Sequence, residues 1–357
     1  MHDRANHGLI LTFKLFPFIE ARFMSNTFTT AFGIRYPILM APMFLVSNEA
    51  MVQAAMEQEI AGTFPSLNYR KDGELAAVLE RLNARKAALD GRRGNYGVNL
   101  IVQRSNPLYE QHLQVCVAAK VPFYITSLGN PRQVIDAAHS YGAKVLCDVT
   151  NLQHAQKAAS EGADGFIAVC AGAGGHAGPY PMQVLVPALR GAFPHLPVIA
   201  AGGIANGQQI ASALVLDAAG VSIGTRFIAS TEAGVSDAYK QGIVQYGMDD
   251  IVPTERLSGT PCNIINTPAA KQMGYRQNWL EKLLSRNAKT KRYFKMLVQL
   301  KGMKKLEKAV HPGAYQQLWT AGQSVEMIHD ISSIAHIVHQ LTAELETSQQ
   351  QLYDLHF

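Results

Sequence analysis

The sequence predicts an α/β protein, a (β/α)8 TIM barrel with a C-terminal helical extension. Eight short runs are almost continuously apolar, which is typical of strands covered on both faces, as in a parallel sheet. Successive runs begin 21 to 35 residues apart, which leaves room for the crossover that joins two parallel strands. Eight such units in series favour a closed barrel. A doubly wound open sheet made from the same units is the alternative.

The predicted strands share this apolar character and differ mainly in length. In chain order they are Pro37–Met43, Ala61–Ser66, Tyr96–Val102, Phe123–Leu128, Lys144–Val149, Gly165–Cys170, Pro197–Gly202 and Ala219–Thr225.

Helical signals fill the gaps between these strands. We expect Thr150 to cap one helix in a capping box with Gln153, and Asn206 to cap another. Pro131 stands in a first helical turn, where proline is accepted. The predicted helices are Ser47–Gln58, Asp72–Leu89, Pro107–Ala119, Pro131–Tyr141, Asn151–Gly162, Gln183–Phe193, Asn206–Leu216 and Thr231–Tyr239.

These signals divide the chain into three regions. Residues 1–30 form a poorly specified leader without a signal-peptide cleavage site, and Met24 is an alternative start to Met1. Residues 31–250 hold the barrel. Residues 251–357 begin with an irregular segment, Pro253–Gly274, and continue as a helical extension or lid, which either contributes substrate contacts or only packs on the barrel. Its predicted helices are Gln277–Leu284, Lys289–Leu306 and Ser324–Gln349.

Composition and charge limit the partners that the chain can have. Much of the basic excess behind the net charge of +5 lies between Arg276 and Lys308. We interpret it as a solvated helix face rather than a nucleic-acid surface, because no aromatic stacking pattern accompanies it. No apolar run reaches the ~20 residues of a membrane span. The four cysteines are scattered, without metal-ligand spacing. We therefore expect a cytoplasmic protein with no metal, nucleic acid or membrane partner.

Candidate functional residues follow the strands, because the active site of such a barrel lies where its strands end. Gly202-Gly203 and Gly224-Thr225 follow the last two strands, where backbone N–H groups without a Cβ can approach a phosphate. The helix beginning at Asn206 would add the partial positive charge of its N-terminus. Alternatively, these glycines only make tight turns. Two such sites on adjacent strands favour a phosphate-bearing cofactor.

The glycine-rich loop after the sixth strand carries the candidate catalytic residue, His176. The segment Gly172–Gly178 superficially matches a dinucleotide fingerprint, but the prolines that follow it prevent a helix from opening there. A loop that lets a flat ring approach the backbone explains Gly174 and its neighbours better. His176 could accept a proton from a weak carbon acid or polarise a substrate oxygen. A solvent-exposed or structural histidine is the alternative.

The chain resembles the nitronate monooxygenase (2-nitropropane dioxygenase-like) flavoproteins over roughly residues 34 to 274. The most specific match is Ala173-Gly174-Gly175-His176-Ala177-Gly178, preceded by Gly162-Ala163-Asp164-Gly165. A weaker echo follows at Leu318–Gln323. Further matching segments are Pro42-Met43, Gly97-Val98-Asn99-Leu100, Ala200-Ala201-Gly202-Gly203-Ile204 and Gly224-Thr225-Arg226-Phe227.

The resemblance implies flavin mononucleotide (FMN) at the barrel mouth and His176 as the catalytic residue. The FMN phosphate would lie on Gly203 and Gly224-Thr225, and the ring near Asn99 and Gly174. The implied cofactor-binding residues are Ala41, Pro42, Met43, Asn99, Gly174, Gly175, Gly202, Gly203, Ser222, Gly224 and Thr225.

The implied reaction is the oxidation of an alkyl nitronate by O2 to a carbonyl compound and nitrite. His176 would deprotonate the nitroalkane or hold the nitronate in a cavity that excludes water. The chain departs from many members at Val169, where they have Gln, and at Gly172, where they have an acidic residue. Two alternatives are an NAD(P)H-dependent flavin reductase of quinones or enoyl thioesters, and a phosphate-ligand barrel without redox chemistry. A homodimer is compatible with any of these.

Overall fold

The computed structural model describes residues 27–103, 106–257, 260–276 and 318–355. Eight parallel strands form a closed barrel, in which β9 is hydrogen-bonded back to β1. This closure confirms the predicted barrel against the open sheet, and every predicted run overlaps one of its strands. The strands are β1 (Ile38–Met40), β2 (Ala61–Pro65), β3 (Asn95–Ile101), β4 (Phe123–Ser127), β5 (Lys144–Val149), β6 (Gly165–Val169), β8 (Val198–Ala201) and β9 (Gly220–Ile223).

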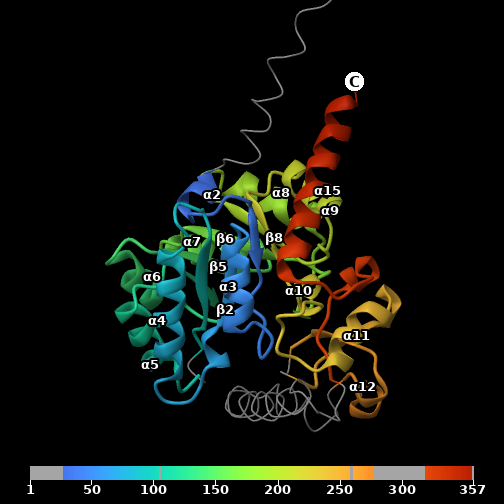
Figure 1. The fold of residues 1–357 in the computed structure, drawn as a ribbon, viewed down its shortest axis with the longest axis horizontal. Helices are drawn as coiled ribbons and strands as arrows, with labels where there is room; N and C mark the ends of the chain where they lie inside the picture. Colours follow the sequence, from blue (N-terminus) through green and yellow to red (C-terminus); the bar gives the residue numbers. More distant parts are fainter. Residues whose placement is uncertain (1–26, 104–105, 258–259, 277–317, 356–357) are drawn as a thin grey trace, which may run out of the picture.

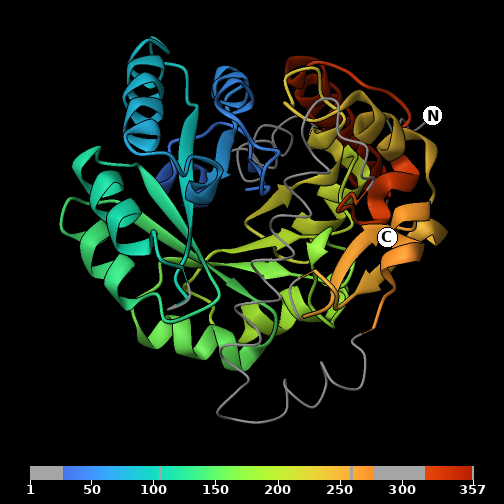
Figure 2. The ribbon, with the colours of Figure 1, turned by 90° about the horizontal axis from the view of Figure 1, so that it is seen from below.

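Helices form an outer ring around the strands, as Figure 2 shows. Most of them lie within the predicted helical ranges or within a residue or two of them. They are α3 (Glu49–Glu57), α4 (Glu74–Ala87), α5 (Tyr109–Ala118), α6 (Arg132–His139), α7 (Leu152–Ser160), α8 (Met182–Ala192) and α9 (Gly207–Val215), with a short 3-10 helix η1 (Ser66–Asn68) after β2.

Two layers of apolar side chains form the core. One layer fills the inside of the barrel and includes Leu39, Ile125 and Leu146. The other lies between the strands and the helices and includes Val98 and Tyr124. Side chains along a strand alternate between its two faces. Consequently the residues two positions beyond Ile125 and Leu146 also face the inside of the barrel, at the end where the strands finish.

A short helix, α2 (Thr27–Ala31), closes the other end of the barrel. Phe28 is fully buried, and its ring packs 4.9 Å from the ring of Phe32. Phe32 in turn meets Phe123 edge-on at 5.2 Å. Helix α2 therefore packs on the barrel although the sequence assigned residues 1–30 to a leader. These aromatic contacts join residues far apart in the chain, so local signals did not reveal them.

The helix N-termini confirm one predicted cap and correct another. At α9 the Asn206 side chain accepts from the Gln209 N–H at 2.9 Å, and the two residues form a capping box. At α7 the predicted Thr150 cap is wrong: Asn151 accepts from the His154 N–H at 2.8 Å. Asn151 keeps the extended backbone that a cap requires. The Thr150 hydroxyl instead lies 3.0 Å from the His154 ring.

The region after β9 differs from the single helix predicted over Thr231–Tyr239. The structure has α10 (Thr225–Ile228) and α11 (Asp237–Gln245). The Thr231 N–H donates to the Ser332 carbonyl at 3.0 Å, as part of a parallel bridge between Ser230 and Ser332. Ser236 then caps α11 through the Tyr239 N–H. Because residues near 231 pair with the C-terminal segment, the helix begins at Asp237 and not at Thr231.

The sequence predicts an irregular segment over Pro253–Gly274, and this prediction is wrong. Residues 251–274 contain β10 (Ile251–Thr254), β11 (Cys262–Ile265) and α12 (Pro268–Met273). The order β10-β11-β7 makes a second, antiparallel sheet, in which β7 is Gly175–His176. A 3-10 helix, η2 (Met248–Asp250), precedes it. Figure 1 shows α12 and α2 near opposite ends of the molecule.

The C-terminal region returns to the barrel. Of the helix predicted over Ser324–Gln349, the structure forms a 3-10 helix, η3 (Gln323–Met327), and then α15 (Ile334–Asp354). Helix α15 packs along α9, where a Cβ on Gly207 would lie 2.2 Å from the Leu345 backbone nitrogen. The predicted helices Gln277–Leu284 and Lys289–Leu306 lie outside the described residues.

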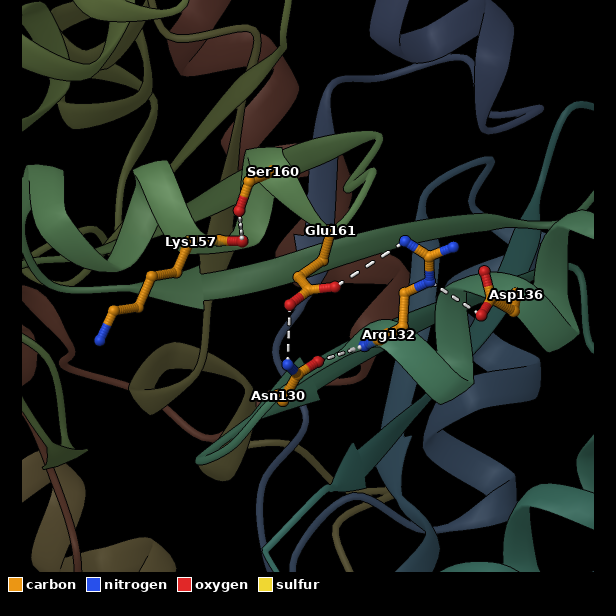
Figure 3. Close-up of polar contacts among 6 residues, drawn as sticks. All are labelled: Asn130, Arg132, Asp136, Lys157, Ser160 and Glu161. Carbon is orange, nitrogen blue, oxygen red and sulfur yellow. Dashed lines mark hydrogen bonds and ion pairs between the residues drawn. The ribbon is translucent and has the colours of Figure 1, made fainter.

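A polar network fastens the loop after β4 to the end of α7 (Figure 3). The Asn130 side chain donates to Glu161 at 2.8 Å and accepts from the Arg132 N–H at the start of α6. Arg132 also forms an ion pair with Asp136, one turn along α6, at 2.9 Å. Exposed pairs of this kind contribute at most about 1 kcal/mol each. Their effect is to hold the βα loop, not to stabilise the fold as a whole.

Candidate active site at the barrel mouth

The loop after β1 is held rigid by hydrogen bonds from its own helix and from the segment after β2. The Met43 N–H donates to Ser47 Oγ at 2.9 Å, and the Asn68 amide donates to the Met43 carbonyl at 3.1 Å. Ala41, Pro42 and Met43 are half-buried. The loop therefore presents a largely apolar, preformed edge to the mouth. The family resemblance implies one side of a flavin ring at this edge.

Strands β3, β4 and β5 place a chain of polar side chains inside the mouth. Asn99 Nδ2 donates to Ser127 Oγ at 2.8 Å and to the Ile125 carbonyl at 3.3 Å. Ser127 Oγ donates to Asp148 Oδ2 at 2.6 Å. Asn99 belongs to the predicted site, but Asp148 does not. A lone carboxylate two positions after the inward-facing Leu146 was the signal that could have revealed it.

Burial raises the pKa of the Asp148 carboxyl to about 6, although the hydrogen bond from Ser127 opposes this shift. A carboxyl group inside an apolar barrel loses its hydration, which disfavours the charged form. Ionisable groups with such shifts gather at functional sites. Asp148 therefore changes charge within the range in which many enzymes work.

The opposite half of the mouth offers bare backbone. A Cβ on Gly203 would meet nothing within 4 Å, and Gly203 has a φ of +78°, which a side chain would strain. A Cβ on Gly224 would meet only the Ala41 and Met43 side chains, at 3.6 Å or more. Gly203 therefore leaves open space in front of its backbone, while Gly224 lies at ordinary contact distance from the apolar edge after β1. Such open backbone is what a phosphate group requires.

Other glycines of the predicted site pack against protein. A Cβ on Gly202 would lie 2.6 Å from the Ala173 nitrogen, and one on Gly174 would lie 2.7 Å from the Gly322 nitrogen. These residues therefore let three loops touch through their backbones. The sequence attributed the glycine at 174 to a ring lying on the loop. In the structure the C-terminal segment occupies the place in front of its Cα.

The C-terminal segment 318–323 is part of this rim. The Gly322 N–H donates to Thr225 Oγ1 at 3.0 Å, and a bridge joins Thr320 to Ile264 of β11. The Thr225 hydroxyl accepts this bond and keeps its own proton for a ligand. Ser222 is buried on β9. The segment thus fixes the position of Thr225 through this hydrogen bond. Local sequence patterns do not predict the contact, because the two residues lie far apart in the chain.

The N-terminus of α9 is less available to an anion than the sequence suggested. The Gln209 N–H is capped by Asn206, and the Ala205 N–H donates to the Gln209 side chain at 2.7 Å. The Gly207 N–H donates to the Glu344 carboxylate of α15 at 2.8 Å. With these donors occupied, a phosphate would depend on Gly203, Gly224 and Thr225 instead.

His176 lies on β7, paired with Cys262 of β11. Asn263 of β11 holds the glycine-rich loop that contains His176, because its side-chain amide donates to the Ala173 carbonyl at 2.8 Å. His176 is an exposed residue, yet desolvation by the surrounding protein lowers the pKa of its imidazole from the ordinary value. The ring is therefore neutral at pH 7 and able to accept a proton.

Other features of the described residues bear on partners. No group of three or more His, Cys, Asp or Glu side chains there could hold a metal ion. None of the helices in the described ranges combines the length and apolar character that crossing a bilayer demands. The four cysteines are buried free thiols.

Comparison with known proteins places the chain in a family. The family model for nitronate monooxygenase matches residues 73–344. A relative from Mycobacterium tuberculosis, a hydroxy-methyl-oxo-octahydro-indene-carboxyl-CoA dehydrogenase, is 31% identical over 69% of this chain and 67% of its own length. The dehydrogenase of the same name from Rhodococcus jostii is 27% identical over 71% of this chain and 69% of its own length.

Solved structures agree with this placement. FabK from Thermotoga maritima superposes with a TM-score of 0.78 at 28% identity, over 92% of this chain and 98% of its own. A nitroalkane oxidase from Streptomyces ansochromogenes shares the fold, with a TM-score of 0.71 over 91% of this chain and 99% of its own, at 24% identity. The chain therefore belongs to the nitronate monooxygenase family and is an oxidoreductase of the flavin-dependent type.

Proposed function

We propose that the protein is an FMN-dependent oxidoreductase that oxidises a small organic substrate at the barrel mouth. The observation that carries this proposal is the backbone without side chains at Gly203, which faces open space, and at Gly224, next to the hydroxyl of Thr225, after two adjacent strands. A side chain at either glycine would fill the cradle, so the residues present fit a phosphate. The apolar edge from Ala41 to Met43 fits one side of a flat ring.

FMN bound there would supply a two-electron acceptor that reacts with O2. Thr225 and the Gly203 and Gly224 amides would bind the phosphate, and Asn99 would face the ring. Neutral His176 would accept the proton that a nitroalkane loses from carbon. The oxidation of an alkyl nitronate by O2 to a carbonyl compound and nitrite is the first candidate, which the family supports. The buried free cysteines fit a cytoplasmic enzyme.

A second candidate is a flavin enzyme that acts on coenzyme A thioesters. The dehydrogenases of Mycobacterium tuberculosis and Rhodococcus jostii, which are named for a hydroxylated carboxyl-CoA substrate, favour this class. The NAD(P)H-dependent reduction of an enoyl thioester belongs to the same class. The barrel, the bare glycines and His176 would serve either reaction.

The visible spectrum of the purified protein tests the proposal, and anaerobic reduction separates the candidates. We expect the absorbance band of an oxidised flavin at about 450 nm. Bleaching by ethylnitronate, with NADH and NADPH inert, would support the first candidate and exclude the reductase. Rapid bleaching by NADH would exclude the first. A colourless protein that takes up no FMN would overturn the proposal and favour a phosphate-ligand barrel without redox chemistry.

A further inference from the structure

We propose that Asp148 selects for a neutral substrate that carries a hydrogen-bond donor, a hydroxyl or N–H group, and selects against anions such as a preformed nitronate. This inference rests on the proposed function, because it takes the barrel mouth to be the substrate site. It deepens that function by favouring the second candidate, because the hydroxylated substrate for which the two dehydrogenases are named carries such a donor, whereas neither a nitroalkane nor a nitronate does. Asp148 would be a specificity-determining residue in contact with the substrate.

The hydrogen bonds from Asn99 to Asp148 run in one direction. The Ile125 carbonyl can only accept, so the nitrogen of the Asn99 amide must face it. The second Asn99 proton goes to Ser127 Oγ, and the single Ser127 proton goes to Asp148 Oδ2. Every proton in the chain therefore points towards the carboxylate. The groups left to face a ligand are acceptors.

Two acceptor oxygens remain. Within the described ranges, Asn99 Oδ1 and Asp148 Oδ1 make no hydrogen bond to protein. An acceptor that is partly desolvated costs free energy until a donor reaches it. A ligand hydroxyl or N–H group satisfies that need, whereas a nitronate, whose oxygens only accept, does not.

Among the described residues, the elements packed against Asp148 place no positively charged side chain beside its carboxylate. Strand β4 faces it with Ser127, and β6 faces it with the apolar Ile167 and Val169. Next to it on β5, Cys147 binds Thr126 on the outer layer, and burial raises the pKa of this thiol to about 12, so it stays neutral. His176, in the loop after β6, is also neutral at pH 7. An anionic ligand would therefore meet a carboxylate without a nearby cation.

The test compares two isosteric probes, benzamide and benzoate, by their difference spectra with the oxidised flavoprotein. At pH 7.5 the wild type should bind benzamide at least about tenfold more tightly than benzoate, the scale of a hydrogen bond to a charged group. In Asp148→Asn that preference should fall by about tenfold or more, because the charge is gone. At pH 5 the wild type should approach the variant. An equal preference in both proteins would overturn the proposal.

Flavin retention separates a substrate donor from the imide N–H of the flavin itself. If Asp148→Asn keeps its flavin, the donor belongs to the substrate, as proposed. If the variant loses flavin while the wild type holds it, the carboxylate binds the cofactor and the proposal is wrong. A wild type that takes up no flavin at all would instead contradict the proposed function.

The pH titration of the flavin spectrum provides a second measurement, which decides the matter if neither probe binds. The wild type should show an inflection near pH 6 that Asp148→Asn lacks. Ser127→Ala removes the hydrogen bond that opposes the shift, so its inflection should move to higher pH. Thr126→Val, on the same strand but facing the outer layer, is the matched control and should titrate like the wild type. Absence of the inflection in the wild type, or its persistence in Asp148→Asn, would overturn the proposal.

Unfolding by urea follows the same group without any flavin. The pKa of Asp148 is about 6 in the folded protein and 3.8 ordinarily, so the acid form favours folding. As the pH rises from about 4 to about 6, the urea concentration at the midpoint of unfolding should therefore fall for the wild type relative to Asp148→Asn. A constant difference across that range would show that Asp148 is not a buried, uncompensated carboxyl.

Discussion

Replacing His176 with Ala is expected to reduce turnover by about 100-fold or more while the protein keeps its flavin, the effect of losing a general base. The imidazole is neutral at pH 7 because the protein around it lowers its pKa, so it is poised to accept a proton. Strand β7 pairs with β11 through backbone, and alanine preserves that pairing. The loss should therefore appear in catalysis and not in folding. Steady-state kinetics with the substrate that reduces the flavin, together with the flavin absorbance at about 450 nm, would measure it.

His195 supplies the matched control. It is exposed in the turn before β8, at the end of the barrel away from the mouth, and His195→Ala should keep full activity. In the wild type, kcat/KM should fall as the pH drops into the acid range, because His176, whose pKa is lowered by desolvation, then becomes protonated and can no longer accept a proton. Undiminished turnover in His176→Ala would remove this histidine from the mechanism.

Replacing Gly322 with Ala is expected to lower the free energy of unfolding by about 3 kcal/mol, the upper end of what overpacking costs. The new Cβ would lie 2.4 Å from the Gly172 carbonyl oxygen and 2.8 Å from the Gly174 nitrogen. Both neighbours are backbone and cannot rotate away, so the segment must move. Its hydrogen bond to Thr225, 3.0 Å long, would then be lost. We therefore expect weaker flavin retention as well. Urea unfolding would measure the loss of stability, and dialysis would measure the loss of flavin.

Gly191 allows a control with the same chemical change. It lies in α8, and a Cβ there would meet nothing within 4 Å. Gly191→Ala should stabilise the protein by about 0.5–1 kcal/mol, because alanine favours a helix more than glycine does. If Gly322→Ala behaved like Gly191→Ala, the close contact between the C-terminal segment and the glycine loop would be wrong.

The elements of the barrel were predictable because each carries its own local signal. The run Lys144–Val149 is apolar except at Lys144 and Asp148, and it forms β5 with those bounds. Asn206 announces α9 because an amide side chain suits a cap. The Thr150 cap failed by one residue, since Asn151 beside it caps equally well and takes the extended backbone. Boundaries of this kind depend on competition between neighbours.

Parts of the site were hidden because partners far apart in the chain create them. Asp148 reads as an interruption of a strand until β4 brings Ser127 to it. The segment Pro253–Gly274 was predicted to be irregular, since a short strand such as β11 forms only when β10 and β7 pair with it. The glycine at 174 suggested room for a ring, but the segment around Gly322 occupies that space.

By itself, the sequence determined the eight alternating units, the position of His176 and the bare glycines after the last two strands. Periodicity, capping residues and glycine are properties of short stretches, so they can be read before folding. Only the tertiary structure decided that α2 closes the barrel and that segment 318–323 braces Thr225. It also decided that β3 and β4 direct their side-chain protons towards Asp148 on β5. Such contacts depend on which distant residues meet, and close packing settles that for the chain as a whole.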